Sequence, residues 1–152
     1  MNKIEKISEL RQILSNLFAS QKLAVLSSFG NAQPYASLVT FASTKDLHHL
    51  IFATTRSTRK FANLSQESRI ALLIDNRSND EKDFSHAVAA TALGTAEEVS
   101  QSERESYLHI YLTKHPHLRE FVSSPSCALI KVNVQKYYVV NRFQNVEELH
   151  IQ

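Results

Sequence analysis

The sequence predicts a mainly β fold with flanking helices, built around a small six-stranded antiparallel barrel. Six segments have the apolar or alternating pattern of strands and follow one another at hairpin-like spacing. The chain lacks the repeated strand–helix alternation that indicates a parallel sheet. Its 152 residues and 43% hydrophobic content suit a single domain, residues 1–152, with a core of its own.

The first half of the chain predicts one long helix and four strands. Apolar residues recur at helical spacing within residues 1–20, so we expect an amphipathic helix packed on the barrel. Strands at Lys22–Ser28 and Pro34–Ser43 flank a Gly30-Asn31 turn and predict a hairpin. The remaining elements expected here are a strand at His48–Thr54, a short helix at about Ser57–Leu64 and a strand at Arg69–Asp75.

The second half predicts two long strands separated by helices. Gly94 indicates a bulge or bend in the first of these strands. Ser102 and Glu105 resemble a helix capping box, and Pro116 suits a first helical turn. The expected elements are a polar loop at Asn76–Asp83, a strand from about Ser85 to Val99, helices at Ser100–Thr113 and Pro116–Val122, a strand at Cys127–Phe143 and a short tail.

Composition argues against several classes of protein. The net charge is +2 with the two signs interspersed, which gives little support for nucleic-acid binding. No apolar run approaches the roughly 18 residues of a membrane span, and the N-terminus lacks the apolar core of a secretory signal. A single cysteine, Cys127, leaves no internal disulfide framework, so a cytoplasmic protein is expected. Two glycines provide neither a dinucleotide-binding fingerprint nor a P-loop.

The seven histidines do not predict a metal site. None of them has the spacing of a zinc motif. A single axial haem ligand stays open as an alternative, with His86, His115 and His117 as candidates, although surface or core-edge histidines are the more common case.

The segment Leu50–Lys60, with the sequence LIFATTRSTRK, predicts an anion site. An apolar strand leads into hydroxyl side chains and three cations just before the expected helix. The first turn of a helix offers unpaired N–H groups and a positive dipole end, and Arg and Lys add charge-assisted donors, which suits a phosphate. A polar turn that caps the helix, with solvated cations, is the competing interpretation. Arg56 could face either way, and we favour Arg59 and Lys60.

This segment and the order of strands around it resemble the pyridoxamine 5′-phosphate oxidase-like FMN-binding split barrels. The family pattern F-x-T-N-x-x-S-R-K is matched by Phe52 to Lys60, and the resemblance extends from about Gln21 to Phe143. It implies a six-stranded antiparallel split β-barrel, FMN as cofactor, and a homodimer with the cofactor in a groove between subunits. The FMN-binding positions that it implies are Ala53, Thr54, Thr55, Ser57, Thr58, Arg59 and Lys60.

The chain also departs from true pyridoxamine phosphate oxidases. Ser37 and Ala42 stand where those enzymes carry an Arg and a Lys, Ala89 stands in place of a flavin-contacting Gln, and the C-terminal Arg-Leu-x-Pro segment is missing. Pyridoxal phosphate synthesis is therefore not expected. The resemblance implies instead an FMN-dependent oxidoreductase acting on a small molecule, with no identifiable catalytic residue. A protein that binds haem or another cofactor without flavin turnover is the alternative, and a deazaflavin could replace FMN.

Asn76 and Arg77 are further candidates for the cofactor site. They follow a buried strand, and their amide and guanidinium groups suit the donors and acceptors of a flavin ring on the same or the partner subunit. A solvated turn is an equally good interpretation. Ser37 and Thr40 lie near the expected groove, where hydroxyls on the exposed face of a strand are the more common case.

Overall fold

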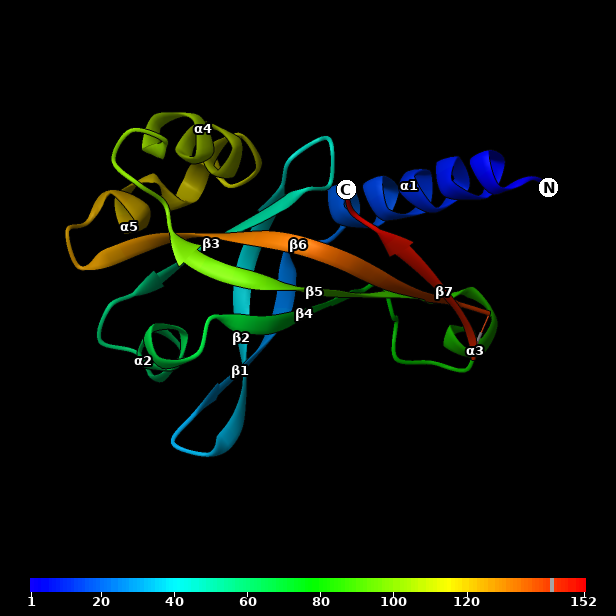
Figure 1. Cartoon of the computed structure of the whole chain (residues 1–152), viewed down its shortest axis with the longest axis horizontal. Helices are drawn as coiled ribbons and strands as arrows, with labels where there is room; N and C mark the ends of the chain where they lie inside the picture. The colour runs from blue at the N-terminus through cyan, green and yellow to red at the C-terminus, as the bar shows by residue number, and fades with distance from the viewer. Residues whose placement is uncertain (143) are drawn as a thin grey trace.

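The computed structural model describes residues 1–142 and 144–152, and within them six antiparallel strands close into a barrel with a seventh strand at its edge (Figure 1). The strand order is β3-β2-β1-β4-β5-β6-β7, and a further pairing of β3 with β6 closes the barrel. This confirms the predicted fold class. The strands are β1 (Leu23–Gly30), β2 (Gln33–Ser43), β3 (His49–Thr55), β4 (Arg69–Asp75), β5 (Val88–Glu98), β6 (Cys127–Asn141) and β7 (Asn145–His150).

The helices lie outside the barrel, with α1 at one end and α4 and α5 over the strands at the other (Figure 1). None in the described part of the chain combines the length and apolarity of a bilayer crossing. The helices are α1 (Lys3–Ser20), α2 (Arg59–Gln66), α3 (Asp83–His86), α4 (Arg104–Lys114), α5 (Arg119–Ser123) and the short 3₁₀ helix η1 (Pro116–Leu118).

Two apolar clusters hold these elements together. The first fills the barrel, where alternate residues of each strand point inward, and it includes the buried face of α1, with Leu14 and Phe18. The second lies between the outer surface of β3 and β6 and helices α4 and α5, with Ile51, Leu129 and Tyr111 at its centre. Because helices cover this outer surface, the first six residues of β6 are all buried.

The β1–β2 hairpin turns at Asn31 and Ala32 rather than at the predicted Gly30-Asn31. Both turn residues have positive φ, 53° and 57°, as a two-residue turn of the right twist requires. Gly30 ends β1, opposite Gln33. Close packing requires a glycine here, because a Cβ at position 30 would stand 2.1 Å from Oδ1 of the buried Asn63 on α2.

The segment between β4 and β5 differs from the prediction. The Asp83 carboxylate accepts hydrogen bonds from the backbone N–H groups of Ser78 and Asn79, at 2.8 and 2.7 Å. This folds the predicted polar loop back on itself and allows the short helix α3, so β5 starts at Val88 rather than near Ser85. The bulge predicted at Gly94 is confirmed by a register shift, and a Cβ there would stand 2.4 Å from the Asn133 carbonyl oxygen.

The predicted capping box at Ser102 and Glu105 is wrong. Helix α4 begins at Arg104 with no side-chain cap, because the carboxylate of its N-cap residue, Glu103, binds the Lys131 ammonium at 3.0 Å instead. Pro116 does begin a helical turn, as predicted, although this turn is the 3₁₀ helix η1.

The predicted short tail forms strand β7, which pairs antiparallel with β6. Its sequence, NVEELH, has too few apolar residues for a strand pattern, and Leu149 alone enters the barrel core. Lys6 on α1 forms an ion pair with Glu147 at 2.7 Å, which joins the two ends of the chain. The predicted end of the preceding strand, at Phe143, lies outside the described residues.

Candidate cofactor site

The turn from β3 into α2 is built by threonine hydroxyls. Thr58 is the N-cap of α2, and its Oγ1 accepts a hydrogen bond from the Phe61 N–H at 3.3 Å and donates to the Thr55 carbonyl at 2.8 Å. The hydroxyl of the buried Thr54 lies 3.0 Å from the same Oγ1. The predicted polar turn therefore exists, and the hydroxyls of Thr54 and Thr58 hold its shape.

A groove of about 340 Å³ opens beside this turn. It lies between the start of the β1–β2 hairpin, the end of β3 and helices η1 and α5. Of the predicted site residues, five line the groove, while Ser57 and Arg59 lie exposed on the same turn. The groove is lined by Leu23, Leu38, Val39, Thr40, Ala53, Thr54, Thr55, Thr58, Lys60, Leu118 and Phe121.

The three cations of the turn have different partners. Arg56 makes a two-pronged ion pair with Glu98, at 2.8 and 2.6 Å, and this contact holds the pKa of the Glu98 carboxyl below its ordinary value. Arg59 and Lys60 have no ion pair or side-chain hydrogen bond with any residue that the structure describes. The turn therefore presents two unpaired cations, with Lys60 half-buried at the groove.

The first turn of α2 adds backbone donors to these cations. The N–H groups of Arg59 and Lys60 have no acceptor among the described residues, as is usual for the first turn of a helix. The Thr55 hydroxyl lies at the groove as well. Lys60 and the Thr55 hydroxyl lie at the groove, while Arg59 and the two free N–H groups belong to the adjoining helix turn. The oxygens of an ionised phosphate accept hydrogen bonds, so this set of donors suits a phosphate group.

Asn76 and Arg77 lie at the far end of β4 from α2, next to α3 (Figure 1). The Asn76 side chain accepts the Val88 N–H at 2.7 Å, and Arg77 forms an ion pair with Asp75 at 3.1 Å. Asn76 lines a separate cavity of about 520 Å³. Within one chain, the structure does not bring either residue to the groove.

A sequence model described as pyridoxamine 5′-phosphate oxidase matches residues 9–141 of this chain. The chain belongs to this family. No protein of curated function matches it in sequence.

Solved structures share the fold of this family member at low sequence identity. A heme binding protein from Mycobacterium smegmatis has a TM-score of 0.81 at 16% identity, with 95% of this chain aligned to 57% of that protein, so this chain spans little more than half of its length. General stress protein 26 from Bacillus anthracis has a TM-score of 0.72 at 19% identity over 94% of this chain and 99% of that one. A FAD-binding protein from Mesorhizobium loti has a TM-score of 0.67 at 12% identity over 84% and 90% of the two chains.

The structure shows the surroundings of residues on β2 where the sequence departs from the family pattern or was expected near the groove. Ala42 is buried under α4, in the second apolar cluster. Ser37 has a buried Oγ with no hydrogen-bond partner among the described residues. Thr40, which was expected near the groove, lines it rather than lying on an exposed strand face, and its hydroxyl lies 2.7 Å from that of the buried Tyr111.

Sequence reasoning missed the apolar wall of the groove. Leu38 lies on the same face of β2 as Thr40, so strand periodicity could have identified it from Thr40. Leu118 and Phe121 reach the groove only because η1 and α5 pack beside β3, which no local pattern indicates.

The histidines of this family member do not form a metal centre in the described residues, which hold no cluster of three or more candidate ligands. His115, one of the three candidate haem ligands, is buried, and its Nε2–H donates to the Phe41 carbonyl at 2.7 Å. Burial also lowers the pKa of this imidazole. The centre of its ring lies 6.1 Å from that of His117. His86 and His117 are exposed.

Proposed function

We propose that this protein binds FMN with its phosphate at the start of α2, and that it oxidises or reduces a small molecule through the bound flavin. The observation that carries the proposal is the contrast within one turn. Arg56 is neutralised by Glu98, while Arg59 and Lys60 have no partner in the described chain. Members of the family commonly bind flavin.

The residues at the groove fit the cofactor in kind. Lys60 and the hydroxyl of Thr55, which line the groove, would bind the phosphate together with the exposed Arg59 of the same turn. The backbone of Ala53 and the side chain of Thr54, which also line the groove, would contact the ring system. Leu38 and Phe121 supply apolar surface that would exclude water from one side of a flat ring. The flavin, when bound, supplies the redox chemistry, and the chain supplies position and electrostatics.

We also propose a homodimer with the groove at the subunit boundary. Strand register places Leu23, Leu38 and Phe29 on one outer face of the β1–β2 hairpin, where their exposed fractions are 50%, 63% and 45%. A contiguous apolar face of this kind indicates a protein partner, and family members commonly form dimers. Asn76 and Arg77 would then serve the cofactor of the partner subunit.

The dimer has a direct test in sedimentation. Leu38→Glu places a charge on the proposed interface, so we expect the wild-type protein to sediment as a dimer and this variant as a monomer with weakened FMN binding. If the wild-type protein sediments as a monomer and still binds FMN tightly, the proposal of a groove shared between subunits is contradicted.

The cofactor has a test in the visible spectrum and in titration. We expect flavin absorption bands after addition of FMN, and tighter binding of FMN than of riboflavin, which lacks the phosphate. A Soret band with haem and no response to FMN would favour the haem-binding alternative, which a haem-binding structural relative also suggests. Stronger binding of a deazaflavin than of FMN would identify a deazaflavin as the cofactor and leave the proposed binding site unchanged. Equal affinity for FMN and riboflavin would contradict the phosphate assignment.

A further inference from the structure

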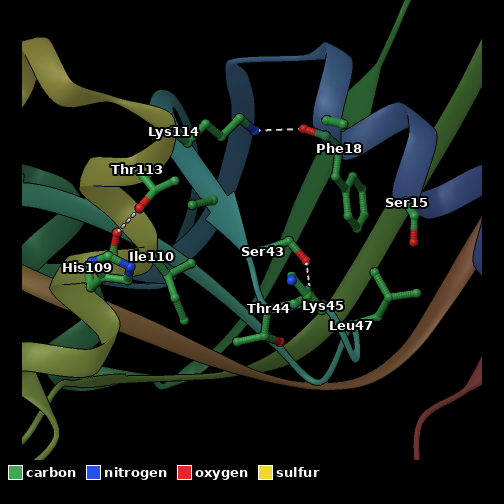
Figure 2. A pocket seen from close by; sticks show the side chains of 12 residues that line it. Ser15, Phe18, Ser43, Thr44, Lys45, Leu47, His109, Ile110, Thr113 and Lys114 are labelled. Atoms are coloured by element: carbon green, nitrogen blue, oxygen red, sulfur yellow. Dashed lines mark hydrogen bonds between the residues drawn. The ribbon is translucent and has the colours of Figure 1, made fainter.

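Another cavity, of about 730 Å³ and larger than the groove at α2, lies between α1, the β2–β3 turn and α4 (Figure 2). It follows the boundary between the two apolar clusters, because Phe18 and Leu47 belong to the barrel core and Ala42 belongs to the outer cluster. It shares no lining residue with the groove at α2. The cavity is lined by Ser15, Phe18, Ala19, Ala42, Ser43, Thr44, Lys45, Leu47, His109, Ile110, Thr113 and Lys114.

Lys114, the last residue of α4, lines this cavity and carries an ammonium group without a counter-ion among the described residues. Its Nζ donates to the Phe18 carbonyl at 2.7 Å (Figure 2) and lies 3.8 Å from the centre of the Phe41 ring. No carboxylate among the described residues lies within ion-pair distance of it. A partly buried cation without an anion is costly to keep, and burial lowers the pKa of this amine to about 8.

The cavity lining carries cations but no acid. Lys45 and His109 are its other titratable residues, and no Asp or Glu takes part. The hydroxyls of Ser43, Thr44 and Thr113 are already engaged with the Thr44 carbonyl, the Asp46 carboxylate and the His109 carbonyl, at 2.8, 2.7 and 2.7 Å. An ammonium group has three N–H donors, so Lys114 can still donate to a ligand.

Apolar side chains line the same cavity as Lys114. Figure 2 shows Phe18, Leu47 and Ile110 projecting from α1, the β2–β3 turn and α4 toward the same space. A ligand that fits this lining has one anionic group and an otherwise apolar body. We propose that the cavity binds a small amphipathic monocarboxylate, with its carboxylate on Lys114 and its hydrocarbon against Phe18, Leu47 and Ile110.

This binding is independent of the proposed flavin function, because the two cavities have separate linings. The test uses octanoate as the probe and the full chain at pH 7 in a calorimetric titration. We expect saturable one-site binding, with 1-octanol at least about tenfold weaker, because loss of a charge-assisted contact costs about that factor.

Two variants and one control locate the site. Lys114→Met retains the length of the side chain and removes its charge, so we expect octanoate affinity to fall about tenfold or more. Ala19→Trp fills the cavity from an exposed position on α1, which leaves the core intact, and should abolish binding. Lys3→Met, on the exposed start of the same helix, should change nothing. Circular dichroism confirms that each variant is folded.

The pH dependence separates Lys114 from the other titratable groups of the cavity. We expect wild-type affinity for octanoate to fall between pH 7 and pH 9.5 as the amine loses its proton. The same series on Lys114→Met, which retains Lys45 and His109, should lack this fall. Absence of saturable octanoate binding, or equal affinity in wild type and Lys114→Met, would overturn the proposal.

Discussion

Replacement of Arg59 and Lys60 tests the phosphate site charge by charge. Lys60 is half-buried at the groove, so its contact with a phosphate should contribute about 1.5–3 kcal/mol, which corresponds to a factor of about 10 to 150 in the dissociation constant of FMN. Arg59 is exposed and more strongly screened by solvent, so we expect a factor of about two to five. The double variant Arg59→Ala, Lys60→Ala should therefore lose at least about twentyfold.

The control for this prediction comes from the same turn. Arg56→Ala combined with Glu98→Ala removes a neutral ion pair close to the groove, and we expect less than about a threefold change in FMN affinity. The assay is quenching of flavin fluorescence, with riboflavin measured in parallel. Because riboflavin has no phosphate, all variants should bind it alike. The reasoning is refuted if the loss for FMN also appears for riboflavin, or if the control variant loses as much as the double variant.

Three further predictions concern the framework around the two cavities. Gly30→Ala should destabilise the fold by about 1–3 kcal/mol in urea unfolding, because the added Cβ would overlap Asn63. The double variant Gly30→Ala, Asn63→Ala should lose less stability than the two single variants together. Additive losses would contradict this contact. Tyr137→Phe should cost about 1–2 kcal/mol, because the buried Leu47 carbonyl loses its donor at 2.7 Å, and an unchanged urea midpoint would argue against that bond. The pKa of Lys114 falls from 10.5 to about 8 on folding, so between these pH values the amine is protonated in the unfolded chain and neutral in the folded one. The free energy of unfolding of the wild type should therefore rise with pH over this range relative to that of Lys114→Met. Parallel pH profiles of the two proteins would show that the amine is not buried.

Local patterns in the sequence predicted most of the framework. The apolar period of α1, the alternation in the strands and the bulge at Gly94 all depend on residues close together in the chain, and all are present. The segment from Thr54 to Lys60 was also identified locally, since hydroxyls and cations at a strand–helix junction need no distant information. The errors at Gly30 and Ser102 arose where a distant side chain decided the outcome, Asn63 in one case and Lys131 in the other.

The sequence by itself determined the succession of strands along the chain, the polar turn before α2 and the presence of three cations in that turn. Only the tertiary structure decided which of them is free, because the partner of Arg56 lies 42 residues away, at the end of β5, and reaches it through closure of the barrel. The same holds for β7, which is a strand because β6 offers it an edge, and for Lys114, whose missing counter-ion is visible only after α1 and α4 have packed. Period and capping depend on neighbours along the chain, whereas pairing of charges and the shape of cavities depend on residues that folding brings together.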